Sequence, residues 1–413
     1  MQKSQINSEH HKKSSLTTKS GHGALDGILV VDFTRVLGPP FCTMLLGDLG
    51  AEVLKIELPG VGDEFRHSPP VIENESFTFI LHNRNKKSIT INLKTQKGKE
   101  ILYALIKKAD VFVENLKPDS TRDLKIDYAT LSKMNPRLVY CSISGFGQEG
   151  PLKNYPAYDL IAQAMSGMLS ISGTLDGRMA ISGISLCDLA AGIYGALGIV
   201  SSLYSRESTG VGQHVDVSLL RSTISVLGPM AGIYSGENRI PRPGEKERFI
   251  IPYGIFETMD RPIVIEAAGP VTWKKLCEAI GALDWLTDER FATNLSRRKY
   301  RDDLIPALQE KLKKKTSSEW LELFSKLGVP AAPILNLQEV FEHPHMQETG
   351  MITTLNHPKL GKVRTMGPAI KLSKTPLTIR SPPPSLGQHT DEILTSLGFS
   401  KDEITSFHSE GVV

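Results

Sequence analysis

The chain has 413 residues, of which 40% are hydrophobic and 23% are charged. This is the balance of an ordinary globular protein, and it excludes the disordered, collagen-like and coiled-coil classes. The 48 basic and 45 acidic side chains leave a formal net charge of +3, so the concentrated basic surface of a nucleic-acid-binding protein is not expected. A small-molecule partner is favoured, and a prior of roughly 150 residues per domain predicts two or three domains.

The cysteines and the apolar runs indicate a soluble intracellular protein. The cysteines lie far apart, with no CxxC pair and no mixed Cys/His spacing, which disfavours both a disulfide framework and a zinc module. No apolar run approaches the ~20 residues that a membrane-spanning helix needs, so no membrane partner is expected. The four cysteines are Cys42, Cys141, Cys187 and Cys277.

Residues 1–23 are expected to form a flexible tail, because they hold too few apolar side chains to order themselves. A mitochondrial transit peptide is rich in Arg and poor in acidic residues, whereas this segment has no Arg and contains Glu9. A cytoplasmic location is therefore expected, with the mitochondrial matrix as the alternative.

Residues 24–220 alternate between short apolar segments and amphipathic ones, and they are expected to form most of a large domain. Such alternation predicts an α/β fold with an open parallel sheet, in which ligands bind at the carboxyl ends of the strands. Strands are expected at 27–33, 52–57, 88–93, 111–115 and 138–143. Helices are expected at 41–49, 95–108, 120–134, 158–168 and 186–205.

A change in composition separates this region from a smaller one. Residues 221–248 are rich in Gly, Pro and charge, which predicts a linker. Residues 249–327 predict a small α+β domain, with two strands joined at Met259-Asp260 and helices at 272–280 and 296–315. Residues 328–413 begin with a strand pattern and are too short to fold alone. We expect them to complete the large domain, which makes the small domain an insertion.

The chain lacks the loops by which many α/β proteins bind nucleotides. No GxGxxG motif follows the first predicted strand, and no GxxxxGK[ST] motif occurs. Gly192, Gly195 and Gly198 recur at a spacing of three, but they lie inside an apolar helix. Close helix packing is the favoured interpretation of this spacing, and a phosphate-binding loop is the alternative.

Asp188 has the most unusual surroundings of the acidic residues. It lies among small and apolar residues at the start of the helix expected over 186–205. There the positive end of the helix dipole and free backbone N–H groups are expected to keep its carboxylate ionised. Two interpretations remain open: Asp188 is a plain helix N-cap, or it is a carboxylate nucleophile.

Other candidate groups carry weaker signals. Asp159 also lies at a helix start and is a second candidate carboxylate. Cys187 is interpreted as a packing residue, because no His or Lys is placed nearby to activate its thiol. His343 and His345 suggest a metal site, but no third ligand lies near them, so a turn is favoured and no metal is expected.

Several segments carry a family resemblance in a fixed order. They are Leu25-Asp-Gly-Ile-Leu-Val-Val-Asp-Phe-Thr-Arg-Val36, Leu46-Gly-Asp-Leu-Gly-Ala-Glu-Val-Leu-Lys-Ile-Glu57, Ser144-Gly-Phe-Gly-Gln-Glu-Gly-Pro151, Tyr158-Asp-Leu-Ile-Ala-Gln-Ala-Met-Ser-Gly167, Asp188-Leu-Ala-Ala-Gly192, Thr209-Gly-Val-Gly-Gln213, Arg290-Phe-Ala-Thr-Asn294 and Leu386-Gly-Gln-His-Thr390. Through them the chain resembles the class III CoA-transferases, the CaiB/BaiF family, from Leu25 to the C-terminus.

The resemblance implies a fold, an assembly and a nucleophile. It implies a Rossmann-like large domain built from both chain ends, an inserted smaller domain and a homodimer whose subunits interlock like links of a chain. It also implies that Asp188 attacks the thioester of an acyl-CoA. A mixed anhydride and then an aspartyl-CoA thioester follow, and the acceptor carboxylate reverses these steps. Coenzyme A is thus implied as part of the substrate, with no tightly bound cofactor.

The resemblance also assigns contacts to coenzyme A, with Asp159 in a supporting position. The implied contact residues are Arg35, Val36, Leu37, Gly38, Lys94, Asn115, Leu116 and Tyr158. The chain departs from the formyl-CoA transferases, which have Gln, Arg and Glu at the positions of Leu37, Leu58 and Asp159. Their Gly-rich loop over the active site has no obvious counterpart either, so oxalate and formate are disfavoured as substrates.

Two other functions remain open at this stage. The same fold hosts α-methylacyl-CoA racemases, which use a His together with the Asp; here Tyr158 occupies the His position, and a phenol with an ordinary pKa of ~10 is a poor base. A non-catalytic CoA-binding protein is the third possibility. The acids exchanged are not specified by any motif, although the family favours succinyl-CoA as donor and small carboxylic or dicarboxylic acids as acceptors.

Overall fold

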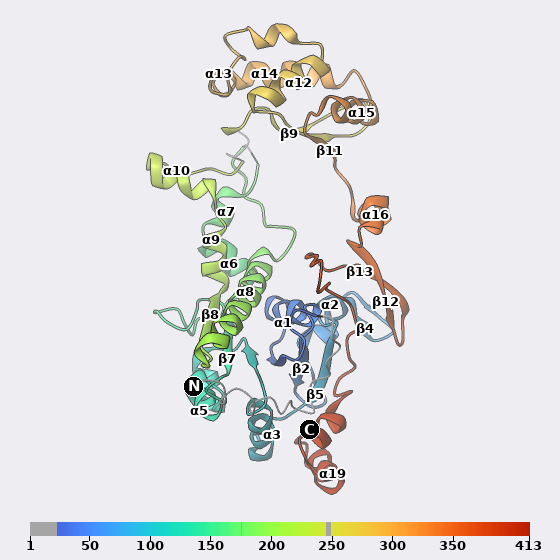
Figure 1. Ribbon diagram of the computed structural model, residues 1–413. Coiled ribbons are helices and arrows are strands. Elements are labelled where there is room, and N and C mark those ends of the chain that lie inside the picture. The colour runs from blue at the N-terminus through green and yellow to red at the C-terminus, as the bar shows by residue number, and fades with distance from the viewer. Residues whose placement is uncertain (1–22, 175, 245–248) are drawn as a thin grey trace, which may run out of the picture. The chain divides into compact units, whose positions relative to one another are not determined.

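The structure is a computed structural model that describes residues 23–174, 176–244 and 249–413 (Figure 1). It divides into two compact units. Unit 1 comprises the described residues up to Met168 together with Ser182–Val226 and His345–Val413. Unit 2 comprises Leu169–Ile181 and the described part of Leu227–Pro344. The predicted tail lies almost wholly outside the described residues.

Unit 1 is built on a six-stranded sheet whose strands are all parallel. In spatial order they are β5 (Lys86–Thr90), β2 (Glu52–Glu57), β1 (Leu29–Phe33), β6 (Val111–Glu114), β7 (Val139–Ser144) and β8 (His214–Ser218). The five strands expected from the sequence are confirmed as β1, β2, β5, β6 and β7. Strand β8 was not anticipated, because its alternating His-Val-Asp-Val-Ser sequence lacks the continuous apolar run of a buried parallel strand.

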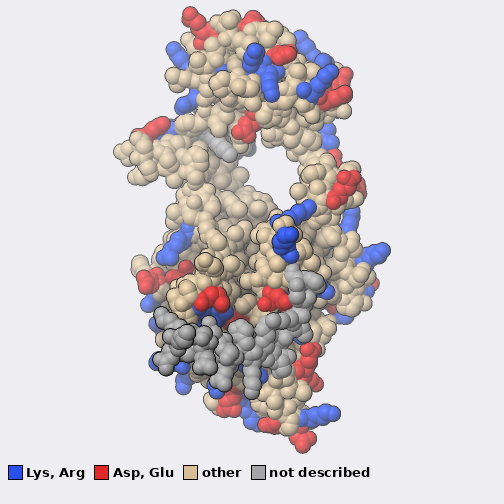
Figure 2. All heavy atoms as spheres, in the orientation of Figure 1, with Lys and Arg blue, Asp and Glu red and all other residues tan. Residues whose placement is uncertain are grey.

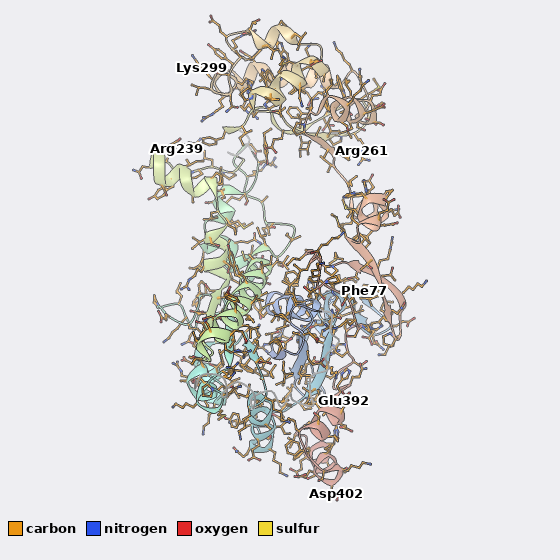
Figure 3. All side chains as sticks on the ribbon, in the orientation of Figure 1. Phe77, Arg239, Arg261, Lys299, Glu392 and Asp402 are labelled. Atoms are coloured by element: carbon orange, nitrogen blue, oxygen red, sulfur yellow. The ribbon has the colours of Figure 1, made fainter. Side chains whose placement is uncertain are left out.

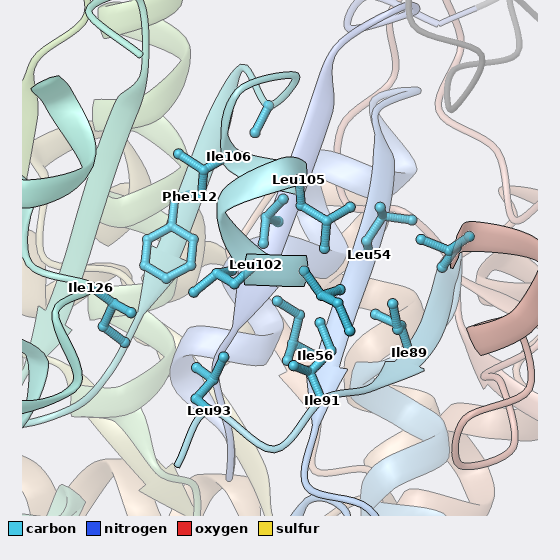
Figure 4. Close-up of a cluster of buried hydrophobic side chains, with 14 of the residues drawn as sticks. Leu54, Ile56, Ile89, Ile91, Leu93, Leu102, Leu105, Ile106, Phe112 and Ile126 are labelled. Carbon is cyan, nitrogen blue, oxygen red and sulfur yellow. The ribbon is translucent and has the colours of Figure 1, made fainter. Parts of the chain in front are cut away.

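Helices cover both faces of this sheet. One face packs against α3 (Gln96–Ile106), α5 (Tyr128–Met134), α18 (Thr390–Ser396) and α19 (Lys401–Ser409), and Figure 4 shows part of this apolar cluster. The other face packs against α1 (Gly38–Asp48), α6 (Asp159–Met165), α8 (Leu186–Thr209) and α9 (Leu219–Ser225). Parallel strands buried on both faces explain the continuous apolar runs in the sequence.

The end of the chain therefore returns to the core that the first strands begin. Leu394 of α18 and Phe407 of α19 are buried in the same apolar cluster as Leu29 and Val31 of β1. Glu392 of α18, labelled in Figure 3, forms an ion pair of 2.9 Å with Lys87 on the edge strand β5.

Two predicted helices are each divided in the structure. The helix expected over 120–134 is α4 (Pro118–Leu124) followed by α5, because Lys125 adopts a left-handed conformation with φ of 60° that ends α4. The helix expected over 158–168 is α6 followed by the single turn α7 (Met168–Ile171), with Gly167 at φ of 85° between them.

The glycines of α8 are packing residues, which confirms the favoured interpretation of their spacing. A Cβ atom on Gly192 would lie 2.5 Å from the carbonyl oxygen of Gly38, and one on Gly195 would lie 3.0 Å from the sulfur of Cys42. A Cβ on Gly198 would lie 2.6 Å from the side chain of Val215 on β8. Helix α8 thus approaches both α1 and the sheet closely.

Helix α8 corrects the expectation that no segment of the chain is long and apolar enough to span a membrane. By length and composition it is apolar enough to cross a membrane, with 24 residues and a mean hydropathy of 1.6 over its best 18-residue window. Glycines and serines interrupt the apolar sequence after Asp188, so uninterrupted apolar runs do not reveal this helix. Half of the window is buried in the protein.

Unit 2 contains a three-stranded antiparallel sheet in the order β11 (Ala331–Pro333), β10 (Ile263–Glu266) and β9 (Tyr253–Phe256). Its core packs these strands against α12 (Pro270–Ala279), η2 (Leu283–Leu286), α14 (Arg301–Leu312) and α15 (Ser317–Leu327), with α13 (Asn294–Lys299) alongside. The two strands and the first helix were predicted, whereas the helix expected over 296–315 is divided at Tyr300. Figure 3 labels Arg261, which pairs with Glu339 of α16 (Leu337–Glu342) at 2.8 Å.

Two boundary segments differ from their predicted form. The described part of 221–248 contains the end of α9 and the helix α10 (Pro229–Glu237), where the Gly and Pro content suggested an irregular linker. The strand expected from residue 328 is β11, which pairs with β10 of unit 2, and unit 1 resumes at His345. Local composition does not specify with which sheet a short strand pairs.

Smaller elements complete the chain. They are η1 (Glu64–His67), β3 (Val71–Ile72), β4 (Glu75–Ser76), α2 (Phe77–His82), α17 (Pro344–Glu348), β12 (Ile352–His357) and β13 (Gly361–Met366). Strands β3 and β4 pair as one antiparallel hairpin, and β12 and β13 pair as another. Basic and acidic side chains are interspersed over the face that Figure 2 shows.

We expect Gly192→Ala to destabilise the protein although Ala favours helices. Its methyl group would collide with the carbonyl of Gly38, and such overpacking typically lowers the free energy of unfolding by about 1–3 kcal/mol. Gly232→Ala on α10 is the matched control, because its Cβ meets nothing within 4 Å and should raise that free energy by up to ~1 kcal/mol. Urea unfolding of both variants measures the difference, and equal effects would contradict the packing role of Gly192.

Candidate active site

A cavity of about 230 Å³ lies at the carboxyl edge of the sheet in unit 1. Turns that follow β1, β6 and β7 form its walls, together with Glu64 and the segment before α6. It contains five of the residues that the resemblance assigns to coenzyme A. The lining residues are Arg35, Val36, Glu64, Asn115, Leu116, Lys117, Ser120, Ser144, Gly145, Lys153, Tyr155, Pro156, Ala157 and Tyr158.

Hydrogen bonds between turns hold this wall together. The side-chain oxygen of Asn115 accepts a hydrogen bond from the backbone N–H of Arg35 at 3.1 Å, and its NH2 group donates to the carbonyl oxygen of Arg35 at 3.0 Å. The turn after β1 is therefore tied to the turn after β6. A second cavity of about 210 Å³ adjoins the first and shares Arg35, Glu64 and Leu116 with it.

Three predicted contact residues lie outside the lining of both cavities. Leu37 precedes the first residue of α1, and Gly38 packs against Asp188, whose carbonyl oxygen would lie 2.4 Å from a Cβ at Gly38. Lys94 is exposed after β5, where its backbone N–H donates to the side chain of Asn92.

The cavity also contains charged residues that the sequence analysis did not single out. Lys117 and Lys153 line it, and Glu64 forms an ion pair of 3.2 Å with Arg35. Lys117 directly follows Asn115 and Leu116, two of the implied contact residues at the end of a predicted strand, so its position was a usable signal. Lys153 lies in a turn and Glu64 begins the short helix η1, and the placement of both depends on tertiary structure.

Asp188 lies in the first turn of α8 and is half-buried. Ser185 occupies the N-cap position, so the interpretation of Asp188 as a plain N-cap is wrong. Asp188 does not line the cavity, but two of its contacts are close in sequence to the lining residues Val36 and Tyr158. Gly38 contacts its backbone, and Asp159, the neighbour of the lining residue Tyr158, contacts its N–H group.

The free N–H groups of α8 bind Asp159, and this corrects a second expectation. One carboxylate oxygen of Asp159 accepts hydrogen bonds from the backbone N–H groups of Cys187 at 2.8 Å and Asp188 at 3.3 Å. The other oxygen accepts from the side chain of Gln163 at 2.5 Å. The donors expected to stabilise the carboxylate of Asp188 are thus directed at Asp159.

The carboxyl group of Asp188 consequently titrates far from its usual range. Burial, reinforced by the negative charge of Asp159, raises the pKa of Asp188 from 3.8 to about 7. A carboxylic acid with such a pKa is poised between its two forms at neutral pH, which is a frequent property of catalytic carboxylates. Burial also raises the pKa of the Cys187 thiol to about 11, which confirms that Cys187 is suited to packing rather than to nucleophilic attack.

A second buried carboxyl group binds the backbone of a residue that lines the cavity. Glu114, at the end of β6, is fully buried, and one of its oxygens accepts a hydrogen bond of 2.7 Å from the N–H of Leu116. Burial raises the pKa of Glu114 to about 7. The glutamate therefore fixes the turn that carries Asn115 and Leu116.

Comparison with known proteins gives one consistent result. The family model described as CoA-transferase family III matches residues 25–390. The chain belongs to this family. It is 38% identical over 392 residues to the succinyl-CoA:glutarate CoA-transferase of Homo sapiens, a match that covers 94% of this chain and 90% of that protein. It is 40% identical over 353 residues to the acetyl-CoA:oxalate CoA-transferase of Acetobacter aceti, with coverage of 85% and 90%.

The solved structures agree with this family membership. A CaiB/BaiF family protein from Brucella suis matches with a TM-score of 0.80 and 34% identity, and the match covers 91% of this chain and all of that one. Rv3272 from Mycobacterium tuberculosis matches with a TM-score of 0.81 and 29% identity, over 90% and 99% of the two chains. The resemblance inferred from the sequence is confirmed, and the chain is an acyl-CoA:carboxylate CoA-transferase of family III.

The raised pKa of Asp188 predicts a pH-dependent effect of Asp188→Asn on stability. A folded-state pKa raised to about 7 makes the folded wild type lose stability as pH rises between about 4 and 7, because only the unfolded chain ionises there without penalty. Relative to wild type, Asp188→Asn should therefore be more stable at pH 8 than at pH 4.5. Urea unfolding at the two pH values measures this.

Asp123→Asn, on the exposed side of α4, provides the control and should show little change between the two pH values. In an Asp159→Asn background the gain from Asp188→Asn at pH 8 should shrink, since one cause of the raised pKa is removed. A gain that is independent of pH would contradict the assignment of this pKa to Asp188.

Proposed function

We propose that this enzyme moves coenzyme A from succinyl-CoA, or a similar acyl-CoA, to a small carboxylic or dicarboxylic acid, with Asp188 as the nucleophile. The observation that carries the proposal is the half-buried carboxyl group of Asp188 in the first turn of α8, with a pKa raised to about 7. Its N–H group contacts Asp159, the neighbour of Tyr158, which lines the cavity at the carboxyl edge of the sheet. The relative named for succinyl-CoA:glutarate transfer supports this choice of donor and acceptor. The relative named for acetyl-CoA:oxalate transfer keeps oxalate among the acceptors to be tested, although the departures from the formyl-CoA transferases disfavoured it.

The reaction proceeds by successive exchange at acyl carbons. A carboxylate oxygen of Asp188 bonds to the thioester carbon of the donor, and the C–S bond breaks. Coenzyme A is released as its thiolate, and the donor acyl group and Asp188 are joined in a mixed anhydride. The thiolate then attacks the side-chain carboxyl carbon of Asp188 in that anhydride. An aspartyl-CoA thioester forms, and the donor acid departs as its carboxylate.

The acceptor carboxylate completes the cycle through the same bonds. It attacks the aspartyl thioester and expels the thiolate, which then attacks the acceptor carbon of the new anhydride and frees Asp188. No water, electron pair or net proton is consumed. A carboxylate nucleophile suits this chemistry because each intermediate is an anhydride or a thioester. Asp159 supports the site by holding the first turn of α8 and by poising the pKa of Asp188 near neutrality.

The cavity is the proposed binding site of the coenzyme A moiety. Arg35, Val36, Asn115, Leu116 and Tyr158 contact the ligand in this proposal, and the two lysines that line the cavity supply positive charge for its phosphates. Leu37, Gly38 and Lys94 remain predicted contacts. Gly38 has a further role, since its missing Cβ lets the turn approach the backbone of Asp188.

We also propose the family's interlocked homodimer, with unit 2 as the inserted smaller domain. The exposed apolar side chains on one face of α8 support an interface: Ile193 is 54% exposed, Leu197 58% and Tyr204 84%. An adjoining hollow of about 330 Å³ is lined largely by apolar atoms of α8, β8 and α9. A second copy of the chain would cover this surface.

The covalent role predicts that Asp188→Ala abolishes transfer while leaving binding of free coenzyme A nearly intact. Incubation of the wild type with acyl-CoA and hydroxylamine should trap a modification at Asp188, detected by mass spectrometry. Cys187→Ala should retain both the activity and the trapped species, which separates an aspartyl from a cysteinyl intermediate. Unchanged turnover in Asp188→Ala would overturn the proposal.

A second prediction separates transfer from racemisation. Tyr158 lies in the cavity wall and is 66% exposed. Tyr158→Phe should slow transfer by roughly three- to twelvefold, which is the effect of losing one hydrogen bond from the phenol hydroxyl. The wild type should also exchange no α-proton of a 2-methylacyl-CoA with deuterated water. Rapid deuterium incorporation in the absence of an acceptor acid would instead favour a racemase.

A further inference from the structure

Asp63 is a buried carboxylate that the proposed chemistry does not use. It follows β2 and is 3% exposed. Its Oδ2 atom lies 2.8 Å from Nζ of Lys55, and the side chains of both residues are almost completely buried. Burial alone would raise the pKa of Asp63, but the charge of Lys55 lowers it below its usual value, so the ion pair is maintained at neutral pH.

This ion pair is connected to the turn that lines the cavity. Oδ1 of Asp63 accepts hydrogen bonds from the N–H groups of Val36 at 3.1 Å and Phe65 at 3.0 Å. Nζ of Lys55 donates to the carbonyl oxygen of Thr34 at 2.8 Å. Two buried charges therefore hold the backbone on both sides of Arg35, which lines both cavities.

The backbone held in this way is strained. Val36 has φ of 76°, in the left-handed region that β-branched residues avoid. Such a conformation persists only where the surroundings impose it. Here the hydrogen bond to Asp63, together with the clamp of Asn115 on Arg35, imposes it.

We infer that Asp63, charge-compensated by Lys55, is a positioning residue for acyl-CoA recognition, because it holds the Arg35-Val36 turn in its strained, binding-competent conformation. The inference rests on the proposed function of the cavity. If only a fraction of the molecules has this turn in the binding-competent conformation, the apparent affinity for the ligand is reduced in proportion to that fraction. Release of a strained residue is enough to lower affinity by about tenfold.

Asp63→Asn tests the inference directly. An amide has one acceptor oxygen, so in either orientation its NH2 group faces a donor, the N–H of Val36 or the ammonium of Lys55. Calorimetric titration with free coenzyme A should show affinity about tenfold weaker than wild type. In turnover assays KM for acyl-CoA should rise more than kcat falls, since Asp63 does not contact the reacting atoms.

Asp48→Asn is the matched control. Asp48 is also buried and is paired with Arg84 at 2.7 Å, but it ends α1, whereas the Arg35-Val36 turn precedes the start of that helix. It should lose comparable stability and keep wild-type affinity for coenzyme A. Equal affinity in Asp63→Asn and Asp48→Asn would overturn the inference and leave the proposed function untouched. Absence of coenzyme A binding by the wild type would contradict both.

The double variant Asp63→Asn/Val36→Gly distinguishes positioning from general damage. Glycine adopts φ of 76° without steric strain, so the double variant should recover much of the lost affinity. No recovery would overturn the inference. If Asp63→Asn fails to fold, Val36→Pro takes its place, because proline excludes this φ and lacks the N–H that Asp63 binds. Wild-type affinity in Val36→Pro would likewise overturn it.

Discussion

Helix α8 approaches helix α1 until backbone meets backbone, and the geometry of the active site depends on that approach. Gly38 and Gly192 have no Cβ at the two points where such an atom would collide with the backbone of the other helix. The first turn of α8 is thereby placed against the residues that follow β1. Because all six strands are parallel, the turns after β1, β6 and β7 also meet at that edge.

Polar side chains, two of them buried carboxyl groups, hold these turns in place. Asn115 clamps Arg35, Glu114 holds Leu116, and Asp63 holds Val36. A turn at a ligand site buries few apolar side chains in the core. Directional hydrogen bonds are therefore the available means of fixing its conformation.

The carboxylates of the site behave differently because their environments differ. Asp63 has Lys55 beside it, and its pKa is lowered. Asp188 is half-buried beside another acid, and burial together with the charge of Asp159 raises its pKa to about 7. Since nucleophilic attack needs the ionised form, the proposed role of Asp188 implies that transfer responds to pH near neutrality. A carboxylate in this position suits the proposed mechanism, because each of its steps exchanges a carboxylate and a thiolate at an acyl carbon.

The sequence alone determined the fold class, the family, five of the six strands of the sheet and the candidate nucleophile. Buried parallel strands appear as continuous apolar runs, and an acidic residue among small apolar ones at a helix start is visible locally. Strand β8 alternates polar and apolar residues, and β11 is too short to specify its partner, so both needed the assembled structure.

Tertiary structure alone decided the electrostatics of the site. Asp159 takes the N–H groups at the start of α8 from 28 and 29 positions away, and Asp63 binds the N–H of Val36 from 27 positions away. The pKa of a carboxyl group depends on burial and on neighbours within a few ångströms. Those neighbours come from distant segments, and no local pattern in the chain specifies them.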